Sequence, residues 1–359
     1  MRPFWGLVVV MLVAACGSAA SPAKHVTAAR PPTPSATPTL AEAPTATPYQ
    51  APPTTAPVYT SPQSASAATY ARLATFNCRI PISNGQPGSG GFISIPGGTF
   101  ASDPASNVVL DWTGAPPPKQ PQQGPGPSRP TSFGLSFDRA VGRWLPVGPT
   151  WVTPDGQSYA YPDFVGGGVR WVKVADGSVT TLGGSNSWNL LDVETEGAYA
   201  VRTDSTGQAP SGLWLLAPGK DPVQVIGSGY WSWVTTGFAY GYDAPSVPAG
   251  APHPLLRFNL RDHTTVTWYQ DGNQVQWVPG FDRGGAPIVV IPPANYQYQP
   301  SFETALLAAP DTKNTLLKAP QGTQSAIQDA HGYWLAADQL YFNGVPVSAV
   351  QGQLGGGCA

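Results

Sequence analysis

Short stretches of alternating apolar and polar residues recur along the chain from residue 71 to residue 359. Turns rich in Gly, Asp and Asn separate them, which is the pattern of β-strands joined by hairpins. A repeating unit is visible: an aromatic-led strand, a glycine turn and a second strand, followed by another strand pair with a polar turn. The glycine turns hold Gly156, Gly197, Gly237, Gly285 and Gly332, at spacings of 41, 40, 48 and 47 residues.

Six units of about 40–50 residues can be counted in this way, each with about four short strands. This period and strand number are typical of propeller blades, so we predict an all-β fold, a β-propeller of six four-stranded blades. A proline-rich insertion at residues 113–131 interrupts the first unit. A large two-sheet sandwich is the alternative, and it fits less well because sandwiches do not repeat at this interval.

One unit contains a sharper motif, TPDGQSYAY at residues 153–161. This segment resembles the PDGxxxAY strand turn of TolB-like and WD-like propellers. The other copies have drifted from the motif, and the resemblance covers the rest of the body only as a pattern. It implies protein–protein interaction as the general function and nothing more specific.

The N-terminus has the features of an export signal. Arg2 supplies a positive charge, and residues 3–15 are almost entirely apolar but too few to cross a bilayer as a helix, which needs about 20 residues. The run ends in LVAACG, which resembles the lipobox of bacterial lipoproteins. The resemblance implies that residues 1–15 are removed and that Cys16 is lipidated. An ordinary signal peptide with a coincidental cysteine is the alternative.

Residues 16–70 are expected to form a linker between this anchor and the body. Ala, Pro and Thr supply 35 of the 52 residues from Ala19 to Tyr70, so the segment has no apolar period from which to build a core. We therefore predict a disordered, extended stalk. Its Ser, Thr and Pro content also permits O-glycosylation, and a bare linker is an equal alternative.

The charge composition excludes several classes of protein. With 18 basic and 20 acidic residues the net charge is −2, which provides no electrostatic surface for nucleic acid. Charged residues make up only 11% of the chain, against about 25% in a typical domain, which argues against a coiled coil or helical bundle. The 38 aromatic residues argue against a wholly disordered chain.

Two cysteines, Cys78 and Cys358, remain besides Cys16, and they lie near the two ends of the body. Because disulfides persist in exported proteins, we predict a disulfide between them that closes the ring. A buried free thiol and an intermolecular bridge are the alternatives. The spacing does not fit a metal site.

The motifs of common enzyme classes are absent from the sequence. There is no G-x-S-x-G, H-E-x-x-H, Walker loop or G-x-G-x-x-G, so we assign no catalytic residue, metal or cofactor. Acidic residues in the expected turns could place carboxylates around one rim, although aspartate in turns more often forms Asx-turn hydrogen bonds. These residues are Asp155, Asp176, Asp192, Asp262, Asp282 and Asp329.

Two aromatic clusters are candidate ligand-binding sites, because aromatic rings on propeller loops can stack on sugars or peptides. Packing between sheets is the competing interpretation for each of them. The candidate residues are Tyr230, Trp231, Trp233 and Tyr242 in one cluster and Tyr296 and Tyr298 in the other.

Together these features favour a monomeric, lipid-anchored binding or scaffold module on the extracytoplasmic face of a cell membrane. Its partner would be an envelope protein, a peptide or a glycan. The alternatives are a propeller enzyme of the lactonase or cyclase type, with acids and a metal in a central channel, and a structural or adhesive envelope protein.

Overall fold

A computed structural model of the chain describes residues 73, 75–115, 129–203, 212–243, 253–270, 275–293 and 301–358. The chain divides into two compact units, Met1–Pro57 and Val58–Ala359, and every described residue belongs to the second. The predicted signal peptide, Cys16, the whole of the predicted stalk, Tyr296 and Tyr298 lie outside the described residues, as do residues 116–128 of the insertion. No helix in the described part is long and apolar enough to span a bilayer.

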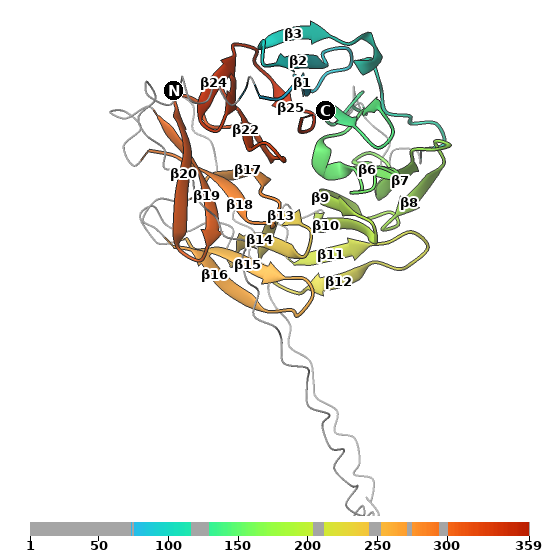
Figure 1. Cartoon of the computed structure of the whole chain (residues 1–359). Coiled ribbons are helices and arrows are strands. Elements are labelled where there is room, and N and C mark those ends of the chain that lie inside the picture. The colour runs from blue at the N-terminus through green and yellow to red at the C-terminus, as the bar shows by residue number, and fades with distance from the viewer. Residues whose placement is uncertain are drawn as a thin grey trace, which may run out of the picture. The chain divides into compact units, whose positions relative to one another are not determined.

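The described residues form seven antiparallel sheets, which Figure 1 shows arranged around a common centre. Two 3-10 turns, η1 (Pro104–Ser106) and η2 (Pro149–Trp151), lie between strands. The first three sheets, in spatial order of their strands, are β25 (Gln353–Leu354), β1 (Cys78–Ser83), β2 (Gly91–Ile95) and β3 (Thr99–Ser102); β4 (Ser136–Asp138) and β5 (Arg143–Leu145); and β6 (Ser158–Pro162), β7 (Val169–Lys173) and β8 (Val179–Leu182).

The remaining four sheets each contain four strands that are consecutive in the sequence. They are β9 (Ser187–Glu194), β10 (Gly197–Thr203), β11 (Leu213–Leu216) and β12 (Val223–Ile226); β13 (Tyr230–Thr235), β14 (Phe238–Tyr242), β15 (Leu255–Asn259) and β16 (Thr265–Tyr269); β17 (Trp277–Phe281), β18 (Pro287–Ile291), β19 (Phe302–Ala309) and β20 (Thr312–Ala319); and β21 (Ser325–Gln328), β22 (Tyr333–Ala336), β23 (Leu340–Phe342) and β24 (Val345–Ser348).

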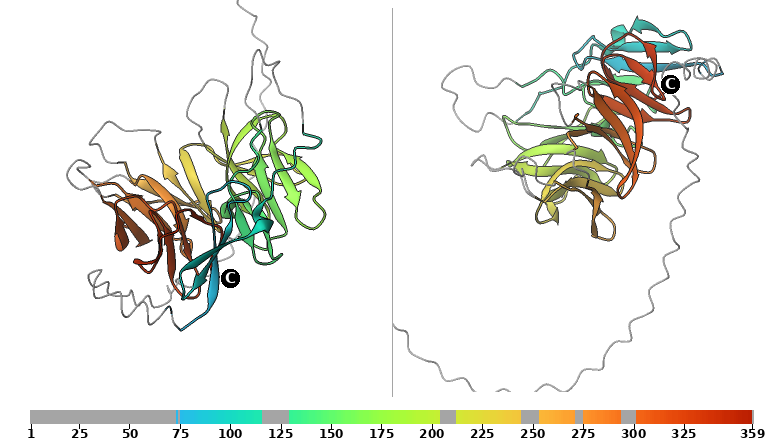
Figure 2. Two further views of the ribbon diagram at one scale, coloured as in Figure 1. Left: turned by 90° about the horizontal axis from the view of Figure 1, so that it is seen from above. Right: turned by 90° about the vertical axis from the view of Figure 1, so that its left-hand side faces the viewer.

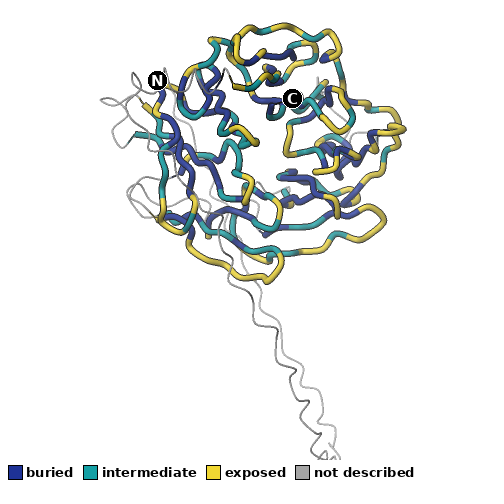
Figure 3. Tube along the Cα trace, in the orientation of Figure 1, coloured by how far each residue is buried: buried dark blue, intermediate teal, exposed yellow. Residues whose placement is uncertain are grey.

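A hydrophobic cluster fills the space between each sheet and the next. Phe92 and Trp144 join the first sheet to the second, and Trp171 and Trp188 lie between the third and the fourth. The last cluster packs Trp334 of the seventh sheet against Ile80 of the first, so the ring closes on itself. Buried residues accordingly follow the strands, whereas exposed residues concentrate at the turns (Figure 3). The tryptophans fill the spaces between sheets, as expected of large apolar side chains.

Seven sheets differ from the six four-stranded blades predicted from the repeat. The first predicted unit, residues 78–148, contains two sheets: the one built on β1 and the one formed by β4 and β5. The C-terminal strand β25 supplies the innermost strand of the first sheet, which period counting along the chain could not show. The second and third sheets have two and three strands, so the expectation of four in every sheet fails there.

Two of the glycine turns have a backbone conformation that favours glycine. Gly237 and Gly285 have φ values of 85° and 79°, a region that residues with a Cβ rarely adopt. Glycine therefore allows the tight reversals between β13 and β14 and between β17 and β18.

The ring closes through three kinds of contact near Cys78. The predicted disulfide joins Cys78 to Cys358, across 280 positions in the sequence. Strand β25 pairs with β1 through Ile82–Leu354 and Ser83–Gln353. Asp329 of the seventh sheet accepts hydrogen bonds from the Cys358 backbone amide at 2.9 Å and from the Trp334 indole at 2.6 Å. The last sheet, the chain end and the first sheet are thus linked directly.

The alternating strand directions give the ring two distinct faces, and Figure 2 shows the sheets from the side. The hairpin face holds the turns that join β7 to β8, β9 to β10, β13 to β14 and β17 to β18. The loop face holds connections such as β1–β2 and β6–β7, together with those that lead from one sheet to the next.

Candidate functional site

The structure places the first predicted aromatic cluster largely inside the protein. Trp231 and Tyr242 are buried, and their polar atoms bond to backbone carbonyls: the Trp231 indole to Ser228 at 2.8 Å and the Tyr242 hydroxyl to Val275 at 3.0 Å. Both residues contribute to hydrophobic clusters between sheets. Their geometry is that of the packing interpretation.

Tyr230 and Trp233 are only partly buried. Trp233 meets Tyr242 edge to face with 6.1 Å between ring centroids, at the margin of a core cluster. A ligand-binding role for these two residues, and for Tyr296 and Tyr298 outside the described set, stays a prediction.

A different aromatic group, which sequence analysis did not single out, lies on the loop face. Phe164, in the β6–β7 connection, is 55% exposed and meets Phe133 edge to face at 5.8 Å. Phe133 in turn packs against Trp151 at 5.3 Å, and Trp112 packs against the buried Tyr161 at 5.0 Å. We call Trp112, Phe133, Trp151 and Phe164 the Phe164 surface.

A buried carboxylate fixes the turn that carries Phe164. The Asp163 side chain is fully buried and accepts hydrogen bonds from the amides of Val165 and Gly166 at 3.1 and 2.8 Å. Arg129 completes the network with two contacts to Asp163, at 3.3 and 3.0 Å, and lies over the Trp112 ring at 5.2 Å. A buried carboxylate is stable only when hydrogen-bond donors or a cation contact it. Here the donors include two backbone amides of the turn itself, so the network holds the turn in one conformation.

The same region anchors both ends of the proline-rich insertion. The Trp112 indole donates to the Pro130 carbonyl at 3.0 Å, and the Leu110 amide donates to the Thr131 carbonyl at 2.8 Å. Tyr161 donates its hydroxyl proton to the Asp111 carbonyl, and burial raises the pKa of this hydroxyl. The Phe164 surface therefore stands beside the base of the insertion.

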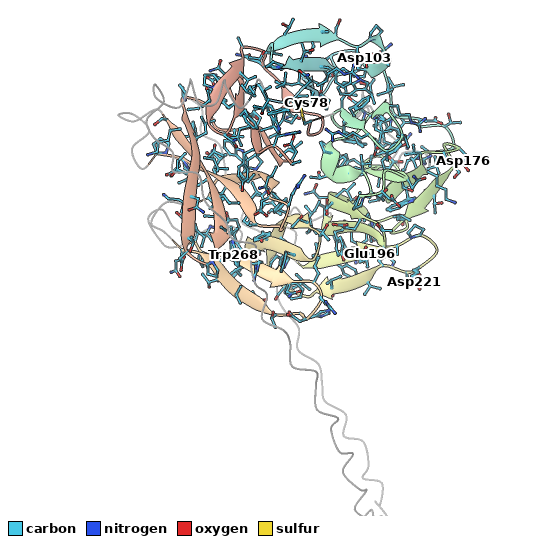
Figure 4. All side chains as sticks on the ribbon, viewed as in Figure 1. Cys78, Asp103, Asp176, Glu196, Asp221 and Trp268 are labelled. Carbon is cyan, nitrogen blue, oxygen red and sulfur yellow. A yellow bond between two sulfur atoms is a disulfide. The ribbon has the colours of Figure 1, made fainter. Side chains whose placement is uncertain are left out.

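Most of the predicted turn acids form hydrogen bonds within their own turns. Asp155, Asp176, Asp262, Asp282 and Asp329 each accept a hydrogen bond from a backbone amide two residues further on, which is the Asx-turn arrangement. Asp176 and Asp221 lie at the periphery of the ring, whereas Glu196 lies farther in (Figure 4). Among the described residues, no group of three or more His, Cys, Asp or Glu side chains is arranged to hold a metal ion.

Asp192 is the exception among the predicted turn acids, because it lies inside strand β9. It is 7% exposed, and the nearby Glu194 is 8% exposed. Glu194 accepts a hydrogen bond from Thr236 of the next sheet at 3.0 Å, and Glu196 accepts one from Tyr199 at 3.0 Å. We call Asp192, Glu194 and Glu196 the carboxyl cluster. It lies toward the hairpin face, where the fourth sheet meets the fifth.

Burial, followed by the neighbouring carboxylates, raises the pKa of Asp192 well above its usual range. Burial also raises the pKa of Glu194, against the lowering effect of the Thr236 hydrogen bond. In sequence this cluster was invisible, because Asp192 reads as the first acid of a hairpin turn rather than as a strand residue.

The closed ring of antiparallel sheets defines the body of this chain as a β-propeller, as its repeat period predicted. No family model and no curated protein matches the sequence. Similar solved structures include a nidogen/laminin complex, with a TM-score of 0.37 and 10% identity over 73% of this chain and 86% of that chain. The dihydro-heme d1 dehydrogenase NirN has a TM-score of 0.44 and 9% identity, over 80% of this chain and 64% of that chain.

Proposed function

We propose that this protein is a lipid-anchored β-propeller that binds an envelope partner through the Phe164 surface and does not catalyse a reaction. The observation that carries the proposal is the 55% exposure of Phe164 on a turn held by the buried Asp163 carboxylate. Leaving apolar surface in water costs about 25 cal/mol of free energy per Å². The exposure of the Phe164 ring therefore does not stabilise the protein by itself. Aromatic anchors on a rigid support are typical of binding surfaces.

The charges near Phe164 define the chemistry of the partner. Arg129 and Asp163 are paired with each other, so they do not call for an oppositely charged ligand. A complementary partner therefore offers apolar or flat surfaces to Phe164, as an envelope protein, a peptide or a glycan can. The predicted stalk would carry the propeller away from the membrane to reach it.

Replacing Phe164 by Ala is expected to weaken capture of the partner by about tenfold or more, because loss of a central aromatic anchor costs roughly 2 kcal/mol. The measurement is binding of the full-length protein, in detergent, to isolated envelope protein and to isolated envelope glycan. Val223→Ala is the matched control, since Val223 is 56% exposed on a different sheet.

The folded state of the Phe164→Ala variant should be unchanged in thermal unfolding, because the ring is largely in contact with water. Photo-crosslinking from position 164 should identify the partner, whereas crosslinking from position 223 should not. Equal capture by wild type and Phe164→Ala would refute the role of the Phe164 surface.

Replacing Cys16 by Ala is expected to move the protein from the membrane to the soluble fraction. Each CH₂ of an acyl chain that enters the bilayer contributes about 0.8 kcal/mol, so loss of two or three chains removes the anchor. Fractionation and incorporation of labelled fatty acid measure the effect, with Ser18→Ala as the control. Continued membrane association of the Cys16→Ala variant would contradict lipid anchoring.

A further inference from the structure

The interface between the β9–β12 and β13–β16 sheets combines an apolar core with buried acids. Val234 and Ala239 of the β13–β16 sheet pack there against Val201 and Leu213 of the β9–β12 sheet. At the margin of this core, the Thr236 hydroxyl donates a hydrogen bond to the Glu194 carboxylate, with 3.0 Å between the two oxygens. This bond links the end of β9 to the β13–β14 turn. The carboxyl cluster is thus part of the contact between two sheets.

The groups that act on Asp192 and Glu194 from every side are acids or hydrogen-bond donors. Asp192 and Glu194 lie two residues apart in β9, opposite Tyr199 and Gly197 of β10, so both side chains are on the same face of the strand, and Glu196 follows in the turn. Tyr199 of β10 donates to Glu196, and Thr236 comes from the next sheet. Among the described residues, neither Asp192 nor Glu194 forms an ion pair, since the ion pairs found there join Arg129 to Asp163 and Lys313 to Glu303.

Glu303 of β19 shows the opposite arrangement and serves as an internal comparison. Its carboxylate forms an ion pair with Lys313 at 3.1 Å and accepts a hydrogen bond from Thr315. Burial acts to raise the pKa of Glu303, but the Thr315 and Lys313 hydrogen bonds outweigh it and hold the pKa below its usual value. A partly buried glutamate in this propeller is therefore paired with a lysine where it is kept ionised.

We propose that Asp192 and Glu194 share a proton in the folded protein, and that loss of this proton with rising pH weakens the packing of the β9–β12 sheet against the β13–β16 sheet. Two buried carboxylates on the same face of one strand, without an ion-pair partner, repel each other when both are ionised, and the low polarity of their surroundings strengthens the repulsion. A shared proton removes one charge and supplies a hydrogen-bond donor between the two groups.

The direction of the pH effect follows from proton linkage. Because the pKa of Asp192 is higher in the folded state than in the unfolded state, the folded protein binds more protons between these two values. Stability contributed by this group is complete below the unfolded pKa and declines as pH rises through the folded pKa. Glu303, with its lowered pKa, contributes stability that is lost as pH falls.

Hydrogen exchange of the full-length protein in detergent, measured at several pH values from about 5 to 9, tests the proposal. After correction for intrinsic exchange rates, protection of the amides of β9 and β13 should fall as pH rises, by a factor of ten for each unit by which the pKa in the folded state exceeds that in the unfolded state. Asp192→Asn should abolish this decline, because an amide cannot ionise and can donate to Glu194.

Two further variants distinguish the interface from general destabilisation. Glu194→Gln should also flatten the decline in β9 and β13, which covers the case in which Asp192→Asn does not fold. Glu303→Gln should leave that decline intact, because Glu303 belongs to another sheet and its carboxylate is paired. A decline of equal size in wild type and Asp192→Asn, or constant protection in wild type, would overturn the proposal. None of these outcomes depends on the Phe164 surface.

Discussion

Replacing Cys78 and Cys358 together by Ser is expected to lower the free energy of unfolding by roughly 3–5 kcal/mol, the largest single effect foreseen for this protein. The disulfide spans 280 positions in the sequence, so it removes much of the freedom of the unfolded chain. Denaturant unfolding at neutral pH, with and without reducing agent, measures the change. The slope of the transition should rise, because the unfolded chain without the disulfide is less compact and exposes more surface.

The ring should open first where the disulfide held it. Strand β25 pairs with β1 at only two positions, so without the covalent link the chain end is held by non-covalent contacts alone. These are the hydrogen bonds of Leu354 to Ser325, of Gly355 to Pro81 and Phe137, and of Cys358 to Asp329, together with the surrounding hydrophobic cluster. Amides of β25 and β1 should lose protection before those of β13. Reducing agent should leave the double Ser variant unchanged, which separates the disulfide from other effects of reduction. Equal unfolding midpoints for oxidised wild type and the double variant would show that the disulfide does not stabilise the ring.

Features that repeat with the period of the fold could be predicted from the sequence. The turn glycines were found by their spacing. For Trp231 the sequence left two interpretations, ligand binding and packing between sheets, and the structure places its side chain in a hydrophobic cluster between sheets. The Cys78–Cys358 disulfide could be predicted because the body contains only two cysteines and a propeller brings its ends together. Each of these inferences depends on residue type and spacing alone.

Features that depend on contacts between distant residues could not be predicted. Phe164 looks like any apolar residue in a loop, and its exposure results from the pairing of Asp163 with Arg129, 34 positions away. Asp192 resembles a turn acid until the register of β9 is known, because an irregularity opposite Tyr199–Ala200 shifts the strand. One sheet was missed because the first predicted unit contains two sheets, and one of these obtains a strand, β25, from the other end of the body.

Gly280 should be the position in an inner strand where a single methyl group causes a large loss of stability. An added Cβ would lie 1.9 Å from the Ala326 carbonyl oxygen, since the backbones of β17 and β21 approach each other closely there. The obstructing atom is backbone, so relief requires β21 to move and disturbs its pairing with β22. Gly280→Ala is therefore expected to lower the free energy of unfolding by about 3 kcal/mol, the upper part of the range for overpacking.

Gly227→Ala provides the matched control for this substitution. Gly227 has no neighbour within 4 Å of an added Cβ and lies in the connection between the fourth and fifth sheets. Alanine there should be neutral or stabilise by up to about 1 kcal/mol, because it restricts the unfolded chain without a clash in the folded one. Denaturant unfolding of both variants measures the difference. If Gly280→Ala unfolds at the same denaturant concentration as Gly227→Ala, the inner strands have room to separate, and close contact between neighbouring sheets at the centre does not hold the ring together.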